Sequence, residues 1–79
     1  SNSIFTGLEK LKILKMIGTR LFIIESNYFD HLENLIHLDF NNFEPVEFVD
    51  ETLFDKLKLI DKDKLKRMFF MNRGRNLYA

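Results

Sequence analysis

The chain contains no cysteine, and it has only one proline and three glycines among its 79 residues. The absence of cysteine excludes disulfide bonds, thiolate metal sites and a cysteine nucleophile, but it leaves the cellular compartment open. Gly7, Gly18 and Gly74 are isolated from one another, so the sequence has no glycine-rich loop for phosphate. No apolar run reaches the roughly 20 residues that a membrane-spanning helix requires, and we expect no membrane partner.

Apolar residues make up 46% of the sequence and include nine phenylalanines, which is enough for a hydrophobic core. The length predicts one small domain or a fragment of a larger protein. We expect residues 1–3 to be a tag remnant or disordered, residues 4–72 to form a single module, and residues 73–79 to form a basic tail.

The net charge is zero, but the charges are segregated along the chain. Residues 21–55 carry nine acids and no Lys or Arg, whereas residues 56–79 carry eight bases against two acids. Such a chain can attract a like neighbour, so self-association is one possibility. Solvated charges that keep a small domain soluble are the simpler interpretation.

Three segments repeat an apolar pattern in which residues three apart are large and hydrophobic. They begin at Phe5, Phe29 and Phe54, which are separated by 24 and then 25 residues. Positions further along recur as well, because Leu14 and Met16 match Leu38 and Phe40 at the same spacing. The repeated sets are Phe5, Leu8 and Leu11, then Phe29, Leu32 and Leu35, then Phe54, Leu57 and Ile60.

This pattern resembles the leucine-rich repeat family in its 24-residue form, with about two and a half uncapped repeats over residues 4–70. The resemblance implies an α/β-type solenoid, in which short strands of successive coils form a parallel sheet on the concave face. No single coil can bury its apolar residues alone, so neighbouring coils must stack. At the family's asparagine position the sequence has Thr19, Phe43 and Met68. The Thr19 hydroxyl can partly substitute there, and a register shift could supply Asn41 or Asn42.

The resemblance also implies a protein-binding or peptide-binding function through the variable residues of the concave strands. Two ladders of side chains are expected across the strands, because aligned strands lie about 4.8 Å apart. One ladder alternates in charge, and the other is the better contact surface. The ladders are Lys15, Asp39 and Lys64, and Ile13, His37 and Lys62.

The same spacing also suits amphipathic helices, so a three-helix bundle is the alternative fold. Its helices would span residues 4–17, residues 29–43, and a segment from Asp50 through Met68, with Gly74 as a stop. Such a helical module would bind protein or nucleic acid through its basic C-terminal segment, or would serve as a self-associating accessory domain.

No catalytic, cofactor or metal motif is present in the sequence, so we expect a protein that is not an enzyme. His31 and His37 lie six residues apart, which is not the spacing of a helical metal pair. The segment Lys62–Arg75 combines six bases with aromatic residues, a composition that can hold phosphates and stack bases. A neutral overall charge makes nucleic acid the less favoured partner, and a core role for residues 68–71 is preferred.

Overall fold

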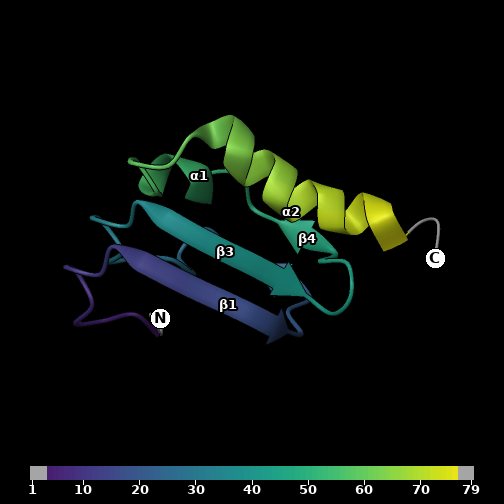
Figure 1. The fold of residues 1–79 in the computed structure, drawn as a ribbon, viewed down its shortest axis with the longest axis horizontal. Coiled ribbons are helices and arrows are strands. Elements are labelled where there is room, and N and C mark those ends of the chain that lie inside the picture. Colours follow the sequence, from purple (N-terminus) through teal and green to yellow (C-terminus); the bar gives the residue numbers. More distant parts are fainter. Residues whose placement is uncertain (1–3, 77–79) are drawn as a thin grey trace.

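The computed structural model describes residues 4–76, and the side chains of residues 4–70. Strands come first along the chain and helices follow, so the fold is mixed α/β (Figure 1). The elements are β1 (Ile13–Thr19), β2 (Ile23–Ile24), β3 (His37–Asn42), β4 (Phe48–Val49), α1 (Leu53–Lys56) and α2 (Lys62–Asn76).

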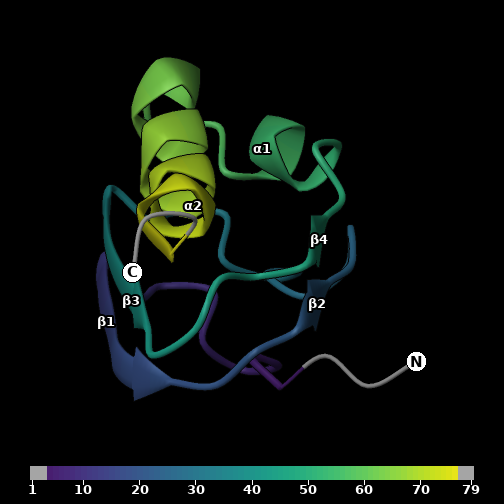
Figure 2. The ribbon, with the colours of Figure 1, turned by 90° about the vertical axis from the view of Figure 1, so that its right-hand side faces the viewer.

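The strands form two separate parallel pairs, β1 with β3 and β2 with β4. Figure 2 shows the two pairs as opposite walls, with the interior between them and α2 above. Side chains alternate in and out of this interior along each strand. In β3, Leu38 and Phe40 point inward and are buried, while the residues between them are more exposed. The core therefore lies between the two sheets.

The register of the longer pair matches the 24-residue spacing of the sequence. Ile13 lies opposite His37, and Lys15 lies opposite Asp39, as expected from the repeat. The third strand expected at Lys62 and Lys64 is wrong, because both residues lie in α2. A helix forms there because Leu65 and Phe69, four residues apart, place their fully buried side chains on one helix face.

The all-helical alternative is wrong as well. Residues 13–19 and 37–42 are strands, so neither of the first two expected helices exists. In the expected helix of residues 29–43, Phe43 would lie on the buried stripe, yet its side chain is 61% exposed. Alternation of period two, and not the helical period, decides which residues are buried in this part of the chain. Gly74 lies inside α2 and does not stop it.

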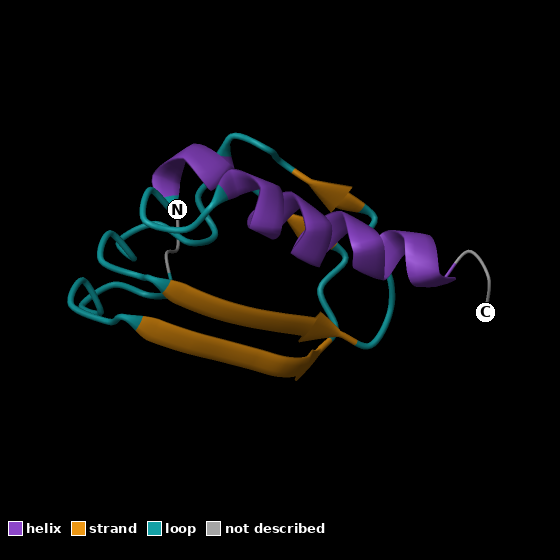
Figure 3. Cartoon of the chain, turned by 45° about the horizontal axis from the view of Figure 1, so that its top comes forward, coloured by secondary structure: helices purple, strands orange, loops and turns teal. Residues whose placement is uncertain are grey.

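The helix α2 closes the core above β3 and β4, where a further strand was expected (Figure 3). Phe69 is fully buried at the centre of an aromatic cluster. Its ring centroid lies 4.7 Å from that of Phe40, 5.8 Å from Phe54 and 6.2 Å from Phe29. The helix thus joins the three repeated segments through one side chain.

The helix α2 begins at a clear cap. The Asp61 carboxylate accepts a hydrogen bond of 3.0 Å from the backbone N–H of Lys64, and the Asp61 carbonyl accepts one from Leu65. An aspartate in this position satisfies an N–H group that the helix itself leaves without a partner. Capping by Asp61 therefore ends any continuation of the strand pattern.

A buried asparagine connects the two strand segments. Asn42 pairs with Thr19, and the register shifts by one residue between Ile17 and Thr19. Gly18 lies at this shift with a φ of +74°, a left-handed conformation that glycine adopts without strain. The shift supplies the asparagine that the 24-residue spacing alone would miss, as the sequence allowed. The Thr19 hydroxyl donates a hydrogen bond of 2.8 Å to Asn42 Oδ1.

The expected division of the chain is only partly tested. The boundary expected between residues 72 and 73 falls within α2, which runs to Asn76. Residues 1–3, expected to be a tag remnant or disordered, and the end of the basic tail at residues 77–79 lie outside the described residues. Within residues 4–76, no helix has the length and apolar character needed to cross a membrane.

Candidate functional site

The outer face of β1 presents three exposed side chains in one row. Strand alternation points Ile13, Lys15 and Ile17 away from the core, while Leu14 and Met16 point toward it. Ile13 is 56% exposed and Ile17 is 66% exposed. Two large apolar side chains therefore flank a lysine on an open surface, which is an arrangement suited to binding another protein.

The neighbouring strand β3 continues this face with polar side chains. His37 lies opposite Ile13, Asp39 opposite Lys15, and Asn41 opposite Ile17. The nearest charged contact of Asp39 is with its own strand, since its Oδ1 lies 3.1 Å from His37 Nε2. The two rows form one surface, which we call the strand face: Ile13, Lys15, Ile17, His37, Asp39 and Asn41.

The strand face holds four of the six residues expected to bind a partner, and not the other two. Lys62 and Lys64 lie in the first turn of α2. The Lys62 ammonium contacts the carboxylate of Asp55, and the Lys64 N–H group caps onto Asp61. The three-rung ladders are thus reduced to the two pairs Ile13–His37 and Lys15–Asp39.

Two residues beside the strand face were not expected from the sequence. The Arg20 guanidinium carbon lies 4.8 Å from the centroid of the Phe43 ring, a cation–π contact at the carboxyl ends of β1 and β3. The Phe43 ring also lies against Gly18, where a Cβ atom would be 3.4 Å from it. The signal that could have found this contact is the one-residue shift, which puts Asn42 inside and leaves Phe43 outside.

The basic C-terminal segment does not offer aromatic rings for stacking bases. Phe69 is fully buried in the core, and Phe70 is partly buried and stacked edge-to-face with Phe54. Both are core residues, as preferred from the sequence. The bases of the segment whose side chains are described are all exposed: Lys62, Lys64, Lys66 and Arg67.

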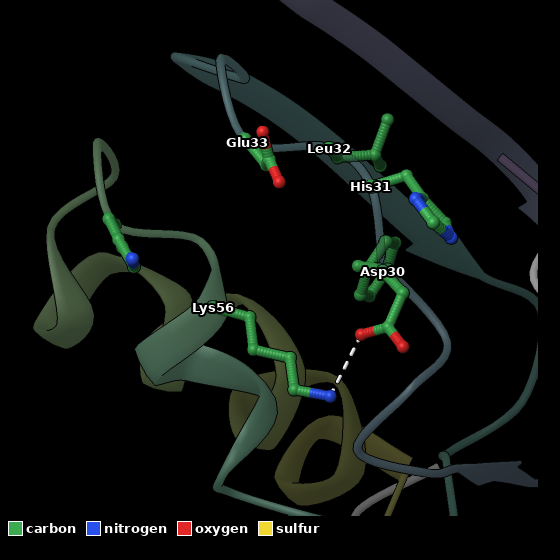
Figure 4. A pocket seen from close by; sticks show the side chains of 7 residues that line it. Asp30, His31, Leu32, Glu33 and Lys56 are labelled. Carbon is green, nitrogen blue, oxygen red and sulfur yellow. Dashed lines mark hydrogen bonds and ion pairs between the residues drawn. The ribbon is translucent and has the colours of Figure 1, made fainter. Parts of the chain in front are cut away.

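A shallow pocket of about 300 Å³ lies on the side of the molecule away from the strand ends (Figure 4). Asp30, His31 and Glu33 line it from the turn before β3, and Lys56 and Lys58 line it from α1 and the turn after it. His31 has a φ of 78°, which is uncommon for a residue other than glycine. An ion pair of 2.8 Å between Lys56 Nζ and Asp30 Oδ1 crosses the pocket.

The pocket gives no arrangement for acid–base or nucleophilic chemistry. His31 Nδ1 lies 3.8 Å from a carboxylate oxygen of Glu9, and both side chains are close to half exposed. Within the described part of the chain, no group of three His, Asp or Glu residues could hold a metal ion. We therefore regard the ion pairs of this pocket as contacts that hold the turn of residues 25–36 against α1.

Comparison of the chain with models of protein families, with curated proteins and with solved structures finds no match. The functional argument consequently depends on the chain's own geometry. The most distinctive surface in that geometry is the strand face, which combines exposed apolar and charged side chains on two paired strands.

Proposed function

We propose that this chain is a protein-binding module of the leucine-rich repeat type, and that it binds a protein or peptide through the strand face. The observation that carries the proposal is the exposure of Ile13 and Ile17 beside Lys15, in register with His37 and Asp39. Exposed apolar side chains on a rigid pair of strands can bind a partner with little loss of conformational entropy.

The repeat assignment is supported by spacing in both sheets. Ile13 and His37 are paired at 24 residues, and Ile23 and Phe48 are paired at 25. One circuit of the chain therefore returns to the same wall after the period found in the sequence. Asn42 supports the assignment further, because its side chain satisfies backbone groups in the turn after β1.

The strand face favours a partner of mixed character. Ile13 and Ile17 call for apolar side chains, Lys15 for a carboxylate, and the His37–Asp39 pair for a group that can exchange hydrogen bonds. Nucleic acid fits this face poorly, because Lys15 is its only permanent cation and Asp39 would repel phosphate.

Charge reversal at matched acids tests the proposal. Peptides are selected from a random displayed library on the full chain, and their affinities are then measured for the variants Asp39→Lys and Glu44→Lys. Glu44 is the control because it is exposed in the loop after β3, outside the strand face. We expect Asp39→Lys to weaken the selected peptides about tenfold, and Glu44→Lys to change them less than about twofold.

Equal losses from the two reversals would contradict the strand face as the binding surface. A second pair of variants probes the apolar part, since Ile13→Ser should weaken binding while Ile23→Ser on the opposite wall should not. Ile23 is a fair match because its side chain is 58% exposed, against 56% for Ile13.

A further inference from the structure

The strand β1 has an outer edge to which no strand of the described chain pairs, since its only partner within residues 4–76 is β3. The carbonyl of Lys12 accepts a hydrogen bond of 3.1 Å from the N–H of His37, so Lys12 directs its backbone groups toward β3. Backbone groups alternate along a strand, so those of Ile13, Lys15 and Ile17 point to the outer edge. In Figure 1 this is the side of β1 away from β3 and α2.

Core side chains beside this edge are covered less than their counterparts in the next segment. Leu14 and Met16 are partly buried, whereas Leu38 and Phe40, at the same positions of β3, are only 1% and 6% exposed. Leu8 is 43% exposed, and its counterpart in the repeat is 2% exposed. The helix α2 closes the core beyond β3, and no described element closes it beyond β1.

The charge around the edge is of one sign. Residues 10–24 contain four cations and no acid: Lys10, Lys12, Lys15 and Arg20. On the paired side, β3 places Asp39 opposite Lys15, between the inward-pointing Leu38 and Phe40. A second copy of this chain would bring the same four cations against one another, which disfavours self-pairing at this edge.

We propose that the outer edge of β1 binds an extended acidic segment of another protein, in which large apolar residues flank an Asp or Glu. Its backbone pairs with that of Ile13, Lys15 and Ile17, as in other complexes in which a peptide adds a strand to a sheet. Its acid lies beside Lys15, and its apolar side chains cover Leu14 and Met16. This surface is the edge of the sheet, and it is distinct from the strand face.

The chain itself supplies a probe with this chemistry. A fluorescent synthetic peptide with the sequence of residues 35–43 contains Leu38, Asp39 and Phe40 in the order that β1 already accepts on its other side. Titration with the full-length chain, followed by fluorescence anisotropy, should give saturable binding that weakens as salt is raised. A titration that shows no binding, or binding insensitive to salt, overturns the proposal.

Proline substitution separates edge pairing from side-chain contact. Ile17→Pro removes an N–H group that points to the outer edge and leaves the hydrogen bonds to β3 in place, and proline is tolerated on an edge strand. Ile17→Ala removes the side chain but keeps the N–H group. We expect Ile17→Pro to weaken the peptide at least about tenfold and Ile17→Ala less than about twofold. Equal losses would overturn edge pairing.

A charge swap gives a test that does not depend on the folding of the proline variant. Lys15→Glu should weaken the peptide about fivefold, and a peptide carrying Asp39→Lys should recover that loss on the Lys15→Glu chain but not on the wild type. An additive loss without recovery overturns the proposal. Sedimentation of the chain alone, showing a dimer that excludes the peptide, would overturn it in favour of a second copy.

Discussion

Asn42 grips the backbone of Leu21 from both sides. Its Oδ1 accepts a hydrogen bond of 2.8 Å from the Leu21 N–H, and its Nδ2 donates one of 2.9 Å to the Leu21 carbonyl. The remaining donor reaches the Glu44 carbonyl at 2.6 Å, and the remaining acceptor site takes the Thr19 hydroxyl. All four hydrogen-bonding positions of the amide are therefore used, and Asn42 is 7% exposed.

Replacement of Asn42 by aspartate should destabilise the protein by about 3 kcal/mol. The substitution keeps the shape of the side chain, but it turns two donors into an acceptor facing the carbonyls of Leu21 and Glu44. Urea unfolding followed by circular dichroism measures the change. Asn41→Asp is the matched control, because Asn41 is exposed one residue away, and it should shift the free energy of unfolding by under about 0.5 kcal/mol. Equal shifts would contradict the role of Asn42.

The strand register could be predicted from the sequence because it depends on residues that repeat. Leu14 and Met16 recur as Leu38 and Phe40, and only one alignment of two parallel strands puts both pairs inside. The position of Asn42 could be foreseen only as an alternative. It depends on the left-handed conformation of Gly18, and a count of residues does not reveal that conformation.

The end of the repeat could not be located from spacing alone. Two signals compete after Ile60, since the repeat predicts a strand at Lys62 and Lys64 while Asp61 can cap a helix. The helix forms because it carries Leu65 and Phe69 together into the core, which a strand through Lys62 and Lys64 cannot do. The strand face therefore lacks the third row that the sequence predicted.

Truncation of Phe69 should test how much α2 contributes to the fold. Phe69→Ala removes a fully buried ring that contacts three other phenylalanines, and large-to-small changes of this kind cost about 3–5 kcal/mol. For a domain of this size, that is a large share of the total stability. Chemical denaturation measures it, with Phe48→Ala as the control because Phe48 is 54% exposed. A small effect at Phe69 would contradict its central position.

Removal of the Asp61 cap should loosen the start of α2. Asp61→Ala leaves the Lys64 N–H without its partner and should cost about 1 kcal/mol in unfolding free energy. Amide hydrogen exchange in residues 62–65 should quicken by about fivefold if only the first turn frays. Asp61→Asn is the control, because asparagine caps helices as well as aspartate does. If alanine and asparagine behaved alike, the hydrogen bond to Lys64 would not be the source of the effect.

Tyr28 should give the protein an alkaline limit that a phenylalanine would remove. Its ring lies edge-to-face against Phe29, with centroids 5.0 Å apart, and against Phe5 at 5.9 Å. Burial raises the pKa of Tyr28 above its usual value of 10.0, because the phenolate would lose hydration in these surroundings.

The folded chain consequently holds this proton at a pH where the unfolded chain has released it. The stabilisation is fully present below pH 10.0 and is lost as the pH rises from there through the higher pKa of the folded state. Tyrosinate absorbance, measured in a Tyr78→Phe background so that Tyr28 alone reports, should titrate above its normal range when folded and return to that range in urea. Tyr28→Phe should lessen the fall in unfolding free energy over the same interval. Identical titrations in the folded and the unfolded chain would show that the ring is not desolvated by Phe5 and Phe29.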